Sequence, residues 1–264
     1  MKIPIYQVDA FTDSLFGGNP AAVCPLDSWL ADATMQAVAE ENNLSETAFF
    51  VRRGDAFEIR WFTPKIEIAL AGHPTLATAH VIYEHLGFTG PRITFLSKSG
   101  ELRVERREGR LVMDFPAFDA APVGTPAELV KGLGKKPSST LLGRDYLAVF
   151  DAESDVAGLR PDFAELEKLD CLGIIVTAPG DSCDFVSRFF APRAGILEDP
   201  VTGSAHTLLI PYWAKRLKKD ALHTFQISRR RGELFCEYKA PRVDIGGRAV
   251  TYMTGTIGVP GESR

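Results

Sequence analysis

The two halves of this chain carry the same short motifs in the same order. The three pairs are Phe-x-Pro at 62–64 and 190–192, a glycine followed by a polar residue at 72–73 and 203–204, and Gly-Glu-Leu at 100–102 and 232–234. The spacing within each pair is nearly constant along the 264 residues. An internal repeat of this kind predicts two lobes of similar structure, because a repeated sequence pattern is the mark of a repeated structural unit.

Each half also contains one helix candidate that is apolar on nearly every face. The segments are PTLATAHVIYEHL from residue 74 and AHTLLIPYWAKRL from residue 205. Such helices belong inside a protein. Short turn signals separate the surrounding strand candidates, so mostly antiparallel strands must wrap around each helix. We therefore expect an α+β fold of two pseudo-symmetric lobes, each a curled, mostly antiparallel β-sheet or barrel around a central helix.

The expected elements fill both halves in a similar order. In the first half, hydrophobic alternation and turn residues predict strands at 3–9, 21–24, 46–52, 56–62, 92–97, 101–106 and 110–115, and helices at 28–41 and 74–86. In the second half they predict strands at 145–150, 172–178, 184–190, 224–229, 233–238, 241–245 and 248–257, and helices at 161–168 and 204–217. Both halves are thus strand-rich.

A segment rich in Pro, Ala and Gly lies between the halves and is the best linker candidate. We therefore expect an N-terminal lobe at 1–118, a linker at 119–128 and a C-terminal lobe at 129–264. The last strand of the C-terminal lobe is free to pack on the first lobe.

Composition excludes several classes of protein. With 45% apolar and 24% charged residues the chain can bury a large core. A formal charge of -4 and a pI near 5.8 suit neither nucleic acid nor an anionic membrane, so we expect neither partner. The N-terminus is typical of a strand rather than a signal peptide, and no stretch reaches the roughly 20 apolar residues of a membrane span. A cytoplasmic location is therefore expected.

Four cysteines stand at 24, 171, 183 and 236. They lack the short paired spacing that zinc or redox chemistry requires, and a chain of this length needs no disulfide. We interpret them as ordinary buried thiols, and we expect no metal site.

The two helix starts are the first candidates for a binding site. A helix N-terminus presents unpaired N–H groups and the positive end of the backbone dipole, which attract a carboxylate or phosphate. Gly72 and Gly203 would let a ligand approach the backbone, while His73 and Ser204 would add an imidazole and a hydroxyl. Pro74 suits the first helical position. If the lobes face each other, the helix starts would converge on one cleft.

Other interpretations of these turns stay open. Gly and Ser are common caps before a helix, and a lone histidine such as His73 can be a satisfied core residue. His206, inside the second helix, is assigned to packing.

Two carboxylates are candidates for proton transfer. Glu46 opens a strand beside the apolar run Ala48-Phe49-Phe50, and apolar surroundings would raise its pKa and suit it to act as general base and acid. Asp199 lies close to Ser204 in sequence and is the natural second carboxylate. The alternatives are a capping or edge glutamate and a turn aspartate before proline.

Four motifs together resemble the PhzF-like family, named for the isomerase of phenazine biosynthesis. They are QVDAFTDSLFGGNPAAV, NLSETAFF, FTPKIEIALAGHPTLATAH and EDPVTGSAH, and they cover most of the chain in the right order. The resemblance implies the fold of diaminopimelate epimerase, with two similar lobes and the active site between them. It also implies a homodimer.

The resemblance implies roles for individual residues. Glu46 would move a proton within a small carboxylic or amino acid, without metal or organic cofactor. The side chains that help bind the substrate and hold or shuttle protons would be His73, Asp199 and Ser204. Gly72 and Gly203 would offer backbone N–H groups to the substrate.

The chain departs from the related epimerases and proline racemases at one point. Those enzymes are expected to carry a cysteine at each helix start, whereas this chain has Ala71 and Thr202 at the corresponding places. A proton shift by one base, Glu46, remains available. The alternatives are a small-acid binding protein without turnover, or an epimerase-type enzyme with bases other than cysteine. A hydrolase built on Ser204 and His206 is disfavoured, because residues two apart on a helix point in different directions.

Overall fold

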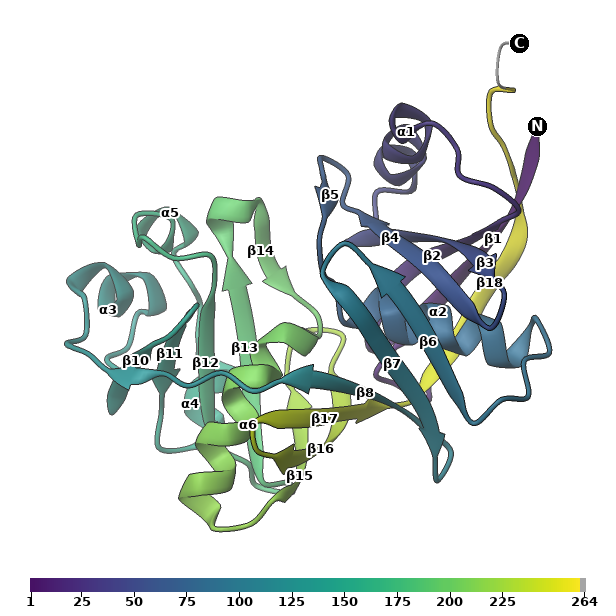
Figure 1. The fold of residues 1–264 in the computed structure, drawn as a ribbon. Coiled ribbons are helices and arrows are strands. Elements are labelled where there is room, and N and C mark those ends of the chain that lie inside the picture. The colour runs from purple at the N-terminus through teal and green to yellow at the C-terminus, as the bar shows by residue number, and fades with distance from the viewer. Residues whose placement is uncertain (262–264) are drawn as a thin grey trace. The chain divides into compact units, whose positions relative to one another are not determined.

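In the computed structural model, which describes residues 1–261, the chain divides into two units (Figure 1). Unit 1 comprises Met1–Asp114 and the C-terminal segment that begins at Gly246, and unit 2 comprises Phe115–Ile245. None of the helices in the described part of the chain is long and apolar enough to span a bilayer.

A curled sheet around one buried helix forms unit 1 (Figure 1). In order of pairing, its main strands are β18 (Ala249–Gly258), β1 (Lys2–Ala10), β2 (Asn19–Leu26), β3 (Glu46–Arg53), β4 (Ala56–Phe62), β6 (Arg92–Ser97), β7 (Gly100–Arg107) and β8 (Arg110–Pro116). The short β5 (Glu67–Ile68) pairs with β4. Helix α2 (His73–Glu84) contacts β1, β2, β3 and β18, and all its residues except His80 and Glu84 are buried.

The second helix of unit 1 packs on the opposite face of the sheet. Helix α1 (Asp32–Asn42) contributes Met35 and Ala39 to an apolar cluster with Ala22 and Cys24 of β2. Because successive side chains of a strand point to opposite faces, these two β2 residues face α1 while their neighbours face α2. The predicted start of this helix at residue 28 is wrong: the chain is still bending at 27–28, and α1 begins four residues later.

The strands of unit 2 belong to the same hydrogen-bonded sheet and have helices on both faces. In order of pairing, its strands are β9 (Ala121–Pro122), β10 (Ser139–Leu142), β11 (Tyr146–Val149), β12 (Ile174–Pro179), β13 (Phe185–Ala191), β15 (Ala221–Gln226) and β16 (Gly232–Lys239). Beside β13 lies β14 (Ile196–Asp199), which follows the short helix η1 (Pro192–Ala194), and β17 (Arg242–Gly247) comes after β16. Helix α6 (Gly203–Leu217) is the buried helix of this unit.

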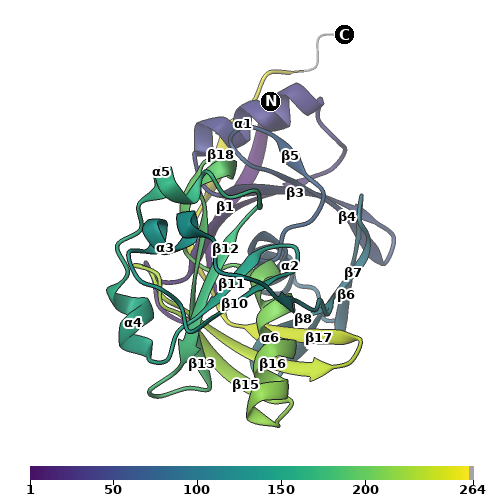
Figure 2. The same ribbon diagram turned by 90° about the vertical axis from the view of Figure 1, so that its left-hand side faces the viewer.

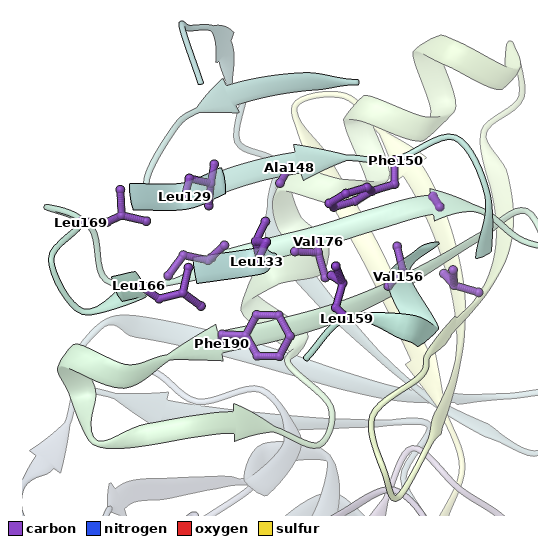
Figure 3. Close-up of a cluster of buried hydrophobic side chains, with 13 residues drawn as sticks. Leu129, Leu133, Ala148, Phe150, Val156, Leu159, Leu166, Leu169, Val176 and Phe190 are labelled. Carbon is purple, nitrogen blue, oxygen red and sulfur yellow. The ribbon is translucent and has the colours of Figure 1, made fainter. Parts of the chain in front are cut away.

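Three short helices cover the face of this sheet away from α6 (Figure 2). They are α3 (Ala127–Leu133), α4 (Glu153–Gly158) and α5 (Phe163–Leu166). Their apolar residues pack on the strands in the cluster of Figure 3, which includes Leu133 of α3, Val156 of α4 and Leu166 of α5 against Val176 and Phe190. The helix predicted at 161–168 is shorter than expected, because α5 spans only Phe163–Leu166. The sequence did not indicate α3 or α4.

The sequence repeat corresponds to a repeat of strand pairing. The series β2–β3–β4–β6–β7 in unit 1 runs through parallel, antiparallel, parallel and antiparallel pairs. The series β11–β12–β13–β15–β16 in unit 2 runs through the same four kinds of pair in the same order. In both units the buried helix precedes the fourth strand of the series. The predicted α+β fold, with a curled sheet around a central helix in each half, is confirmed.

The unit boundaries differ from the ranges expected at 1–118, 119–128 and 129–264. The expected linker is part of unit 2, because it contains β9 and the start of α3. The residue just before it, Phe118, donates its backbone N–H to the Thr207 carbonyl of α6 at 2.9 Å. That carbonyl is available because Pro211, four residues on, has no N–H to complete the helical bond. The last strand, β18, belongs to unit 1, where it pairs with β1 along its whole length.

The turn from β1 to β2 depends on glycine at residue 18. Gly18 has φ +58°, and a Cβ there would lie 2.0 Å from the Ala10 carbonyl oxygen. We expect Gly18→Ala to lower the free energy of unfolding by about 3 kcal/mol, measured by urea denaturation, because backbone strain adds to the clash. Gly54→Ala is the matched control, because Gly54 has φ +62° but open space around its Cβ, and it should cost about 1 kcal/mol. Equal losses in the two variants would show that the close approach at Gly18 is not a constraint.

Candidate functional site

In unit 1 the structure brings Glu46 and His73 together. Glu46 is the first residue of β3 and His73 the first residue of α2. The Nε2 atom of His73 lies 3.1 Å from Oε2 of Glu46, although the alignment falls short of a full hydrogen bond. The side chains are only 6% and 12% exposed, respectively. The sequence indicated each of these residues on its own. The fold places them together as a largely buried pair of a carboxylate and an imidazole.

A third residue, which the sequence did not indicate as a site residue, completes this cluster. Asn19, the first residue of β2, is fully buried, and its Nδ2 lies 3.2 Å from Nδ1 of His73. The parallel pairing of β2 with β3 puts Ala21 opposite Glu46, so Asn19 lies at the same edge of the sheet as the acid. The signal was present in Gly17-Gly18-Asn19-Pro20, which the sequence indicated only as a turn and as part of a family motif.

His73 is neutral at physiological pH. Burial lowers the pKa of His73 to about 3, because the charged imidazolium would lose its hydration, and a backbone interaction with Pro20 opposes this only in part. A neutral imidazole has one donor and one acceptor nitrogen. His73 can therefore serve as a hydrogen-bonding group between Asn19 and Glu46.

The start of α2 also presents backbone N–H groups. Gly72 is the N-cap residue with helical φ and ψ, and no side chain in the described part of the chain caps it. Pro74 occupies the second helical position, one later than expected, because His73 already belongs to the helix. The first turn therefore combines the positive end of the helix dipole with the imidazole of His73.

In unit 2, Asp199 and the start of α6 form a second polar cluster. Asp199 ends β14 and is 8% exposed, and its Oδ2 accepts a hydrogen bond from Oγ1 of Thr202 at 2.5 Å. Gln226, fully buried at the end of β15, accepts from the Thr202 N–H at 2.8 Å and donates to the Asp199 carbonyl at 2.8 Å. No local sequence signal indicated Gln226. It fixes the loop that leads into α6.

Gln226→Met tests whether the two hydrogen bonds of Gln226 stabilise this loop. We expect the free energy of unfolding to fall by about 2 kcal/mol, because the Thr202 N–H and the Asp199 carbonyl would stay buried without their partners. Urea denaturation measures the change. Gln7→Met, at a half-buried position of β1, is the control and should stay within about 0.5 kcal/mol of the wild type. If Gln226→Met lowers the free energy of unfolding no more than Gln7→Met does, these two hydrogen bonds do not stabilise the loop.

The first turn of α6 contains the other predicted residues of unit 2, which are Gly203, Ser204 and His206. Gly203 is the first residue of α6 and is buried, and Ser204 beside it is half-buried. His206 donates from Nδ1 to the Thr202 carbonyl at 2.8 Å, and its ring lies 6.1 Å from that of Phe185. Burial lowers the pKa of His206 to about 4. These contacts agree with the predicted packing role of His206 and do not make it a partner of Ser204.

The structure thus gathers the predicted site residues in two groups. Glu46, Gly72 and His73 adjoin one another in unit 1. Asp199, Gly203 and Ser204 lie within one short segment of unit 2. That the two groups meet at one cleft stays a prediction.

All four cysteines lie outside the two buried helices, α2 and α6. Cys24 and Cys236 are buried in β2 and β16, whereas Cys171 and Cys183 are half-buried, so the expectation of four buried thiols is wrong for those two. Burial raises the pKa of Cys24 to about 12 and that of Cys171 to about 11, so both thiols are protonated at neutral pH. Among the residues that the structure describes, no three His, Cys, Asp or Glu side chains are grouped to hold a metal ion.

Comparison with known proteins identifies the family. A model of the family described as phenazine biosynthesis-like protein matches residues 8–255. The chain belongs to this family. A relative named as an uncharacterized isomerase of Pseudomonas aeruginosa is 54% identical over 258 residues, which cover 97% of this chain and 99% of the relative.

Solved structures agree with the family and with the fold. A crystal structure of a phenazine biosynthesis protein of the PhzF family from Enterococcus faecalis has a TM-score of 0.96 and 48% identity, and the match covers 98% of this chain and 100% of the other. A probable proline racemase from Agrobacterium radiobacter has a TM-score of 0.64 at 12% identity, covering 97% and 93%, which is a likeness of fold alone. This family member has a buried helix in each half. It carries Ala71 and Thr202 before the two glycines.

Proposed function

We propose that this protein is an isomerase that moves a proton within a small carboxylic or amino acid. Glu46 is the single acid/base group, and neither a metal nor an organic cofactor takes part. The observation that carries the proposal is the buried pair of Glu46 and His73 at the start of α2. Family membership and relatives named as isomerases support the reaction class.

Proton transfer by Glu46 has two steps. The carboxylate first removes a proton from a carbon next to the substrate's carboxylate, so that a C–H bond breaks and an O–H bond forms. The electron pair moves into the substrate, where the N–H groups and dipole at the start of α2 stabilise the enolate-like charge. Glu46 then returns the proton to a different carbon and is again a carboxylate. Substrate and product have the same atoms.

Residues of unit 2 also take part in the proposed reaction. Asp199, held by Thr202 and Gln226, and Ser204 bind polar groups of the same substrate and hold or pass protons. Gly203 offers its backbone N–H at the start of α6. We also propose a homodimer on the family resemblance, and light scattering of the purified protein tests it by measuring the molar mass.

Hydrogen exchange with deuterated water tests the proposal. The protein is incubated with a panel of small carboxylic and amino acids, and NMR follows both the loss of substrate C–H signals and the appearance of a product. We expect exchange and an isomer with the double bond or hydrogen shifted between carbons. Calorimetric binding of an acid with no exchange and no product would replace the isomerase with a small-acid binding protein.

The stereochemistry of the product separates the proposal from its nearest enzymatic alternative. Inversion at one carbon, with the bonds otherwise unchanged, would indicate an epimerase that uses bases other than cysteine. The proposed reaction has a single acid/base group, Glu46, and Ala71 and Thr202 supply no thiol pair for the two faces of a carbon, so we expect no inversion.

A further inference from the structure

The amide of Asn19 lies behind the imidazole of His73. Asn19 is fully buried and His73 is 5% exposed, so bulk water does not compete strongly for either side chain. The Nδ2 atom of Asn19 is 3.2 Å from Nδ1 of His73. An amide nitrogen can only donate, so the ring nitrogen that faces it must present a lone pair. The proton of the neutral ring is then on Nε2, the nitrogen 3.1 Å from Glu46.

Electrostatics favours this arrangement over the reverse one. If the Asn19 amide turned its oxygen to the ring, Nδ1 would carry the proton and Nε2 would present a lone pair to Glu46. Two acceptors at 3.1 Å in a buried site repel unless the carboxyl is protonated. With Glu46 ionised, the orientation that has Nδ2 toward the ring is the stable one.

We propose that Asn19 is a positioning residue that holds His73 as the Nε2–H tautomer, with that proton directed at the Glu46 carboxylate. The Nε2–H of His73 then faces the carboxylate oxygen 3.1 Å away, and the ring has no lone pair on that side. The Nε2–H tautomer follows from the geometry of unit 1 alone. Its chemical consequence, that Glu46 rather than His73 receives the substrate's proton, rests on the proposed function.

The backbone around Asn19 suits such a role. Asn19 pairs with Ala10 at the end of the β1–β2 ladder, and the glycine before it holds the tight turn in a left-handed conformation. The Pro20 carbonyl, which also lies beside the ring, is the competing acceptor for a ring proton. Two groups thus compete to set the ring proton: the Asn19 amide, which needs a lone pair on Nδ1, and the Pro20 carbonyl, which needs a ring N–H.

Long-range ¹H–¹⁵N NMR of protein labelled at histidine nitrogen tests the tautomer without any substrate. The His73 signals are assigned by their loss in His73→Gln. At neutral pH we expect Nε2 of His73 to carry the proton and Nδ1 to be unprotonated. Finding the proton on Nδ1 in the wild type would overturn the proposal, whatever the variants do.

Substitution of Asn19 tests the cause. Asn19→Asp places a carboxylate, which can only accept, against the ring, and we expect the proton to appear on Nδ1. Asn42→Ala removes another amide of unit 1, one that bonds Thr47 Oγ1 at 3.1 Å, and should leave the His73 tautomer unchanged. An Asn19→Asp protein that stays folded and keeps its proton only on Nε2 would remove Asn19 from this role. Because no substrate is used, this result is independent of whether the isomerase is found.

Discussion

Glu46→Gln is expected to slow hydrogen exchange between substrate and solvent by about 10²- to 10⁴-fold. A general acid/base group contributes a factor of that size, and an amide cannot take up the proton. The substitution keeps the shape of the side chain, and its amide oxygen can face Nε2 of His73 as the carboxylate oxygen does, so the fold should remain intact. Exchange is measured by NMR in deuterated water with the acid that the wild type processes fastest.

Glu40→Gln is the matched control for this change. Glu40 lies in α1 of the same unit and is exposed, so its loss should leave the exchange rate within twofold of the wild type. Exchange in Glu46→Gln at the rate of this control would remove Glu46 as the base. The same result with product still formed would direct attention to Asp199.

Phe190→Ala is expected to lower the free energy of unfolding by about 3–5 kcal/mol. Phe190 is fully buried, and its ring lies among the apolar side chains that α3, α4 and α5 place on the sheet of unit 2 (Figure 3). Truncation loses the transfer free energy of the ring and leaves a cavity that the neighbouring strands cannot fill. It also removes an edge-on contact with Phe163, whose ring centroid is 6.1 Å away.

Urea denaturation measures this change, and hydrogen–deuterium exchange of peptides from β12 and β13 assigns it to unit 2. Leu172→Ala is the control, because Leu172 is 56% exposed, and its loss should cost no more than about 0.5 kcal/mol. A Phe190→Ala loss below 1 kcal/mol would mean that the cluster of Figure 3 repacks around the missing ring.

The sequence correctly predicted the helices and strands that have a clear hydrophobic pattern of their own. Helix α2 and most strands show hydrophobic periodicity or alternation bounded by turn residues, and they lie within a few residues of the expected ranges. Helices α3 and α4 span seven and six residues, too short to be stable by propensity alone. They are held by contacts with strands far along the chain, and a local pattern does not record such contacts.

The site residues differ in the same way: the local sequence indicates some of them, and contacts with distant residues define the others. Glu46 and His73 each stood out locally, as a charge beside an apolar run and as a polar residue at a helix start. Asn19 and Gln226 did not, because their roles depend on partners 54 and 24 residues away. Polar residues at strand ends are common, and only the fold distinguishes those that hold another side chain in place.

Unit 1 is closed by a strand from the far end of the chain, and this fixes an order of assembly during synthesis. Lys2 of β1 pairs with Gly258 of β18, whereas unit 2 is one continuous segment. A ribosome delivers the N-terminus first, so β1 can pair with β2 early but must wait for its other neighbour until residues 249–258 have been made, while unit 2 can fold earlier. The half that holds Glu46 is therefore the last to become complete.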